Sequence, residues 1–120
     1  MDKNKELSRE HHEKMKNLKN QENVLEKQIS KLEEIKEEQQ AMQNSLSNVY
    51  ENALYHGEVD EFYTKVNMNF EGIKQCDFDI QNRLDNSLEE MRNTWRKVQE
   101  QMEEEDTEYR ERVRALEQEE

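Results

Sequence analysis

The chain has 120 residues, of which 31% are hydrophobic and 40% are charged, and its formal net charge at pH 7 is −12. So polar a composition is poor material for a globular core, and a length of 120 residues limits the chain to one domain or less. The negative charge argues against nucleic acid and anionic lipid surfaces as partners. The chain contains no proline, and its many Glu, Gln, Lys and Leu residues favour helix.

The first predicted helix spans about residues 4–54. Its first 20 residues are mixed in charge with a slight basic excess. Here His11 and His12 could suggest a metal pair, but adjacent helical residues point about 100° apart and cannot chelate one ion together. Zinc also needs three or four converging ligands. We therefore expect both histidines to lie on a solvated helix face.

Apolar residues recur along this helix in steps of three and four, or their sums, which is typical of a helix packed along its length against another helix. The steps from Ile29 to Leu32 and from Leu32 to Ile35 are both three, which predicts a local overwinding that shifts the stripe. The stripe consists of Met15, Leu18, Leu25, Ile29, Leu32, Ile35, Met42, Leu46, Val49 and Ala53.

A turn is predicted at residues 55–58. Gly57 is the first of only two glycines in the chain, and glycine adopts the left-handed conformation that ends a helix without a steric penalty. The turn motif is Tyr55-His56-Gly57.

The second predicted helix spans about residues 59–102, with a looser acidic helical tail to about residue 117. Tyr63 and Cys76 widen its stripe, and Gly72 either allows close approach of a neighbouring helix, which we favour, or marks a mild kink. The stripe consists of Val59, Phe62, Val66, Phe70, Ile73, Ile80, Leu84, Leu88, Met91, Trp95, Val98 and Met102.

Folding back at Gly57 places residues 10–20 opposite roughly 94–104, so that the basic-leaning first turns meet the start of the acidic tail. The same register predicts that Trp95 packs near Leu18.

The predicted fold is all-α: a single long antiparallel helical hairpin, coiled-coil-like, over residues 1–120. Aromatic residues gather near the bend, and the second helix carries more apolar surface than it can bury in its line of contact (the seam) with the first helix. The hairpin is therefore expected to complete a four-helix bundle, with a helical protein partner or as a homodimer. The alternative is that these residues fill the wider end of the hairpin. The candidate partner interface comprises Tyr50, Phe62, Tyr63, Phe70, Phe78 and Trp95.

Signatures of catalysis are missing from the sequence, which has no nucleotide-binding glycine loop, His-Glu-x-x-His motif or paired cysteines. We expect no enzyme, cofactor or metal site. The lone Cys76 needs no oxidising compartment, and neither a signal peptide nor a membrane-spanning run is evident. The expected location is cytoplasmic, with export alongside a partner possible without a classical signal.

Two long helices joined by Tyr55-His56-Gly57 resemble the WXG-type small secreted proteins, in which a Trp-x-Gly turn joins antiparallel helices. The chain is most similar to the small helical proteins encoded beside LXG-domain toxins of Gram-positive bacteria. That resemblance implies an accessory that binds the toxin's helical N-terminal domain and supports its export by the type VII secretion system.

One departure from that family concerns the export signal. Members that carry the signal place Tyr-x-x-x-Asp/Glu after the second helix, whereas Tyr109 is followed four residues on by Val113. The resemblance thus implies an accessory whose partner supplies the signal. Two alternatives stay open: a homo-oligomeric structural coiled coil or scaffold, and a chaperone for a different export apparatus.

Overall fold

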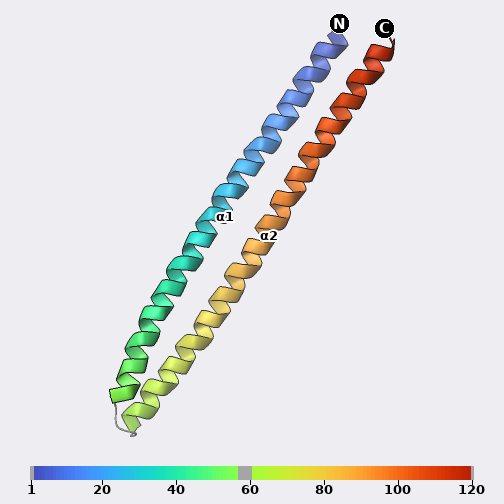
Figure 1. Ribbon diagram of the computed structural model, residues 1–120. Coiled ribbons are helices and arrows are strands. Elements are labelled where there is room, and N and C mark those ends of the chain that lie inside the picture. Colours follow the sequence, from blue (N-terminus) through green and yellow to red (C-terminus); the bar gives the residue numbers. More distant parts are fainter. Residues whose placement is uncertain (1, 57–60, 120) are drawn as a thin grey trace. The chain divides into compact units, whose positions relative to one another are not determined.

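The computed structural model describes residues 2–56 and 61–119, all of which lie in two helices (Figure 1). Helix α1 spans Asp2–His56 and helix α2 spans Glu61–Glu119. No strand occurs within these two ranges. The predicted all-α fold, a long antiparallel helical hairpin, is confirmed.

The helix ends differ from the predicted boundaries. Tyr55 and His56 were expected in the turn, but α1 continues through both, because neither residue breaks a helix. Gly57 and Glu58, the rest of the predicted turn, lie outside the described residues, as does Val59. At the other end, α2 runs without interruption through the acidic tail to Glu119.

Pairs of opposite charge one turn apart support the outer surface of α2. Lys65 Nζ lies 3.6 Å from Glu61 Oε1, and Arg110 Nη2 lies 3.2 Å from Asp106 Oδ2. Each exposed pair of this kind stabilises a helix by about 0.3–0.5 kcal/mol.

Gly72 lies inside α2 and is exposed. A Cβ atom built on it would meet nothing within 4 Å. The expected close approach of a neighbouring helix is therefore wrong for the helices of this chain, since no backbone or side chain crowds this position.

The chain divides into two compact units, which are described separately. The terminal unit combines residues 2–29 of α1 with residues 90–119 of α2. The inner unit combines residues 30–56 of α1 with residues 61–89 of α2.

In the terminal unit the two helices run antiparallel and side by side (Figure 1). The α1 positions that face α2 follow the coiled-coil spacing of three and four, and most of them are apolar. Val98 of α2 is 4% exposed and forms the buried centre of this unit. The half-buried α1 residues are Leu7, His11, Met15, Leu18, Glu22, Leu25 and Ile29.

In the inner unit the same spacing continues along α1, but the residues at it change character. The half-buried α1 residues are Leu32, Lys36, Gln39, Gln43, Ser47, Tyr50 and Leu54. Four consecutive seam positions are thus polar. The apolar residues of α2 supply the core here, with Phe70 at 4% and Leu88 at 3% exposure.

The predicted overwinding at Ile35 is wrong. The helix pair keeps its regular step from Leu32 to Lys36, and Ile35 is left exposed beside the seam. A regular seven-residue spacing keeps one side of each helix toward the other. Polar side chains can occupy such a seam. A long one packs its aliphatic part there and keeps its polar end in water.

Candidate functional site

Two terminal-unit contacts fix how the helices align. The Trp95 indole Nε1 donates to Glu26 Oε1 over 3.3 Å, and the Gln99 amide donates to Glu22 Oε2. The prediction that Trp95 packs near Leu18 is therefore wrong by eight residues of α1. Leu18 instead shares a surface depression with Gln101 and Glu105.

A cluster near the N-terminus of α1 was missed in the sequence. His11 is half-buried and its ring stacks on Tyr109 with a centroid separation of 4.1 Å. Its Nδ1 lies 3.2 Å from Glu105 Oε1 and its Nε2 lies 3.4 Å from Asp106 Oδ1. The expectation of a solvated His11 is wrong, whereas His12 is exposed.

The spacing of the sequence could have revealed this cluster. His11 lies four residues after Leu7 and four before Met15, so it occupies a seam position. Lys14 also approaches Glu105, with 3.8 Å between Nζ and Oε2. The basic-leaning first turns therefore meet the acidic tail, as expected. The predicted alignment of residues 10–20 with roughly 94–104 is wrong, however, because His11 and Lys14 contact Glu105 and Asp106.

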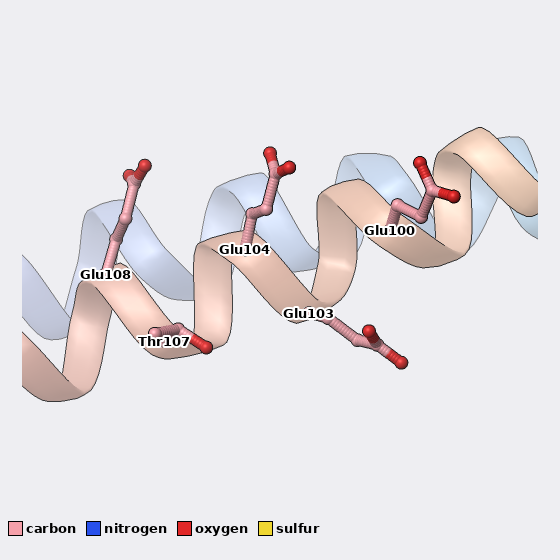
Figure 2. Close-up of a pocket in the computed structure, with 5 residues that line it drawn as sticks. All are labelled: Glu100, Glu103, Glu104, Thr107 and Glu108. Carbon is pink, nitrogen blue, oxygen red and sulfur yellow. The ribbon is translucent and has the colours of Figure 1, made fainter.

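Another surface of the terminal unit is acidic and open. A shallow depression on α2 is lined by Glu100, Glu103, Glu104, Thr107 and Glu108. Figure 2 shows Glu100, Glu104 and Glu108 pointing the same way from α2, while Glu103 and Thr107 point elsewhere. The carboxylates do not converge on a common point, so this depression has the geometry of a solvated helix face.

Over the described residues, no group of three or more His, Cys, Asp or Glu side chains is arranged to hold a metal ion. Nor does either helix, within its described length, carry an apolar stretch that could cross a bilayer. Cys76 is an exposed free thiol.

The structure does not bring the six residues of the predicted interface together. Tyr50 and Phe70 stack on each other inside the hairpin, with ring centroids 5.4 Å apart, and Lys74 Nζ lies 4.1 Å above the Phe70 ring. Tyr63 is half-buried in the same seam. Trp95 belongs to the terminal unit, as its contact with Glu26 shows.

Only Phe62 and Phe78 among the six are largely exposed, at 69% and 60%. They lie on different sides of α2: Phe62 directly precedes the seam residue Tyr63, whereas Phe78 directly follows the half-buried Asp77. In the turn motif, Tyr55 is exposed in the last turn of α1.

A different surface emerges on one side of the inner unit. Ile35, Met42 and Val49 are spaced by seven residues, close to two helical turns, and so lie along one side of α1. Each directly precedes a seam residue, and Met42 and Val49 are 58% and 66% exposed. Leu46 lies between them at the border of the seam.

Helix α2 adds to the same side. Ile80 and Phe62, both exposed, directly precede the seam residues Gln81 and Tyr63. In an antiparallel helix pair, the residues that precede the seam on both helices lie on the same side, because a two-fold rotation relates the helices. The apolar flank consists of Ile35, Met42, Leu46, Val49, Phe62 and Ile80.

The opposite side is polar along the middle of α1. The residues that directly follow the same α1 seam positions are Glu37, Asn44 and Glu51, all exposed. On α2 the exposed residues that follow a seam position include Thr64 and Asn82 but also Phe78. The apolar side chains of the inner unit are therefore concentrated on one side of α1 rather than confined to one side of the helix pair.

Some buried polar atoms in the seam of the inner unit lack a hydrogen-bond partner. Asp77 Oδ1 and Gln81 Nε2 are buried with no hydrogen-bond partner among the described residues, and such groups cost about 1–3 kcal/mol each. Lys36 and Asp85 form an ion pair nearby. The inner unit hence combines unpaired polar atoms inside with exposed apolar side chains outside.

Comparison with known proteins gives no relative: no protein family, curated protein or solved structure matches the chain.

Proposed function

We propose that the chain is a non-enzymatic helical binding module that takes a helical protein partner along the apolar flank of the inner unit. The observation that supports this most directly is the placement of Met42 and Val49. Both are more than half exposed, although their polar neighbours Gln43 and Ser47 are half-buried in the seam. Apolar side chains that remain in water while polar side chains occupy the seam are typical of a partner site.

The finer proposal names the partner. We propose that it is the helical N-terminal domain of an LXG-type toxin, and that the chain escorts this domain to type VII secretion. Support comes from the Tyr55-His56-Gly57 resemblance to the Trp-x-Gly turn and from the apolar flank of the inner unit. Two further helices laid on that flank would complete a four-helix bundle.

The test is co-expression with the N-terminal domain of an LXG-type toxin encoded beside this gene. We expect the two chains to co-purify, Met42→Asp to abolish co-purification, and Gln40→Asp to leave it intact. Gln40 follows the seam residue Gln39 and lies on the polar side, so both variants add the same charge to the same helix. Export of the toxin should fail when this gene is deleted.

Two results would sink the finer proposal: failure to co-purify, or toxin export that survives the deletion. Co-purification that Met42→Asp does not disturb would show that the flank is not the binding site.

A homo-oligomeric structural coiled coil is the second candidate. The regular, mostly apolar seam of the terminal unit favours it, because such a seam is typical of coiled-coil rods. Light scattering after size-exclusion chromatography separates the two candidates. A stable homodimer at micromolar concentration that binds no helical partner would support the structural role.

A further inference from the structure

We infer that the terminal unit is sensitive to pH: protonation of His11 holds the first turns of α1 against the acidic tail of α2, and loss of that proton loosens them. The site is the cluster of His11 with Glu105, Asp106 and Tyr109. It belongs to the terminal unit, whereas the apolar flank belongs to the inner unit. The inference therefore does not depend on the proposed function.

The hydrogen bonds that His11 can make depend on its charge. A neutral imidazole donates from one ring nitrogen and accepts at the other, whereas an imidazolium donates from both. Nδ1 lies 3.2 Å from Glu105 Oε1 and Nε2 lies 3.4 Å from Asp106 Oδ1, and an ionised carboxylate can only accept. Only the protonated ring can therefore bond to both carboxylates. The neutral ring leaves the lone pair of one nitrogen facing a carboxylate oxygen.

The burial of the charged groups around His11 favours the protonated ring. The side chains of His11 and Glu105 are 17% and 13% exposed, so salt and water screen their attraction weakly. Lys14 and Arg110 pair with the same two carboxylates and oppose protonation, but they are 51% and 69% exposed and are screened more strongly. The Tyr109 ring stacks on His11, and the face of an aromatic ring attracts a cation.

The end of the hairpin beyond His11 has a small apolar core. Over residues 2–10 of α1 only Leu7 is half-buried, and over residues 110–119 of α2 only Val113 and Leu116 are. Helix ends with so little buried apolar surface open more easily than the middle of a structure does. The contacts of His11 therefore decide how often this end of the hairpin opens.

The sign of the pH dependence follows from these contacts. Histidine ordinarily changes its charge between pH 5 and pH 8, whereas aspartate and glutamate normally stay ionised over this range. The bonds from His11 to both carboxylates are thus present at the acidic end of the range and lost as the pH rises. The terminal unit should be closed near pH 6 and looser near pH 8.

The experiment measures hydrogen exchange of the backbone amides of residues 6–14 at pH 6 and pH 8, by mass spectrometry on the full chain. The rates are corrected for intrinsic exchange, and the first four amides of α1 are left out because they have no partner within the helix. His11→Gln removes the titrating ring, and His11→Arg replaces it with a planar group that stays charged. His12→Gln removes the neighbouring exposed histidine as the matched control.

We expect the protection of these amides in the wild type to fall about tenfold from pH 6 to pH 8, as loss of a hydrogen bond between charged groups would give. His12→Gln should show the same fall. His11→Gln should be weakly protected at both pH values, and His11→Arg should be well protected at both. Every titrating group other than these two histidines is the same in all four chains.

Three outcomes would overturn the inference. One is equal protection of the wild type at both pH values. Another is a fall in His11→Gln as large as in the wild type, which would assign the pH dependence to the acidic chain as a whole. The third is a fall that disappears in His12→Gln. Should His11→Gln fail to fold by circular dichroism, His11→Arg decides, because its loss of protection at pH 8 would show that charge at this position does not close the terminal unit.

Discussion

At the scale of single residues, the inner unit has glycine and unpaired polar groups where a stable hairpin would have helix formers and apolar side chains. Gly72 is exposed in α2 with open space around it. Gln81 and Asp77 each bury one polar atom without a partner. All three positions lower the stability of the hairpin alone. Substitutions at Gly72 and Gln81 test this effect.

Gly72→Ala should stabilise the chain by about 1 kcal/mol, because alanine loses less backbone entropy in a helix and its Cβ meets no atom here. Chemical denaturation followed by circular dichroism measures the change. A destabilising effect would mean that a neighbouring helix approaches Gly72 in the assembled protein, and comparing dilute with concentrated samples would reveal that contact.

Gln81→Leu should raise the free energy of unfolding by about 1–2 kcal/mol, since it removes a buried amide nitrogen that has no partner and adds apolar contact in the seam. The matched control is Gln75→Leu. The Gln75 amide is exposed and donates to Asp79 over 3.4 Å, so its replacement should change stability by less than about 0.5 kcal/mol. Loss of stability in Gln81→Leu would show that the amide is satisfied.

At the scale of the helices, the register within the terminal unit is the most direct check on the hairpin. Cysteines replacing Glu22 and Gln99, whose side chains are hydrogen-bonded across the seam, should form an intramolecular disulfide on mild oxidation. Cysteines replacing Leu18 and Trp95 should not, because Trp95 pairs with Glu26. Both pairs are made in a Cys76→Ser background, and a mobility shift on non-reducing gels reports the crosslink.

Much of the fold could be predicted from the sequence, because the apolar spacing and the lack of proline are local properties. The prediction was less accurate where the seam becomes polar. Reading only apolar residues assigned Ile35 and Met42 to the seam, whereas the helix pair keeps its seven-residue spacing through Lys36 and Gln43. For the same reason His11 was missed in the terminal unit.

The candidate interface was harder to predict than the helices. Aromatic residues near the bend suggested a partner site, but the rings of Tyr50 and Phe70 stack on each other inside the hairpin. The side of a helix that stays exposed depends on which side its neighbour covers, and this is a tertiary property. The flank of Met42 and Val49 could be identified only after the seam was known.

At the scale of the whole molecule, charge repulsion acts against the hairpin. The net charge is −12, and the cross-helix ion pairs include Lys14 with Glu105, Lys36 with Asp85, and the two carboxylates beside His11. Exposed pairs contribute only about 0–1 kcal/mol each. Repulsion among the excess carboxylates should therefore outweigh them.

Raising NaCl from about 0.01 M to about 1 M shortens the Debye length from roughly 30 Å to 3 Å. We expect the Tm to rise by several degrees over this range, measured by circular dichroism at fixed protein concentration. Replacing Glu100 and Glu104 with glutamine removes two outward carboxylates one turn apart (Figure 2). That variant should have a higher Tm at low salt and a smaller rise with added salt. A Tm that falls as salt is added would instead mean that the cross-helix ion pairs, rather than repulsion, dominate the electrostatics of the hairpin.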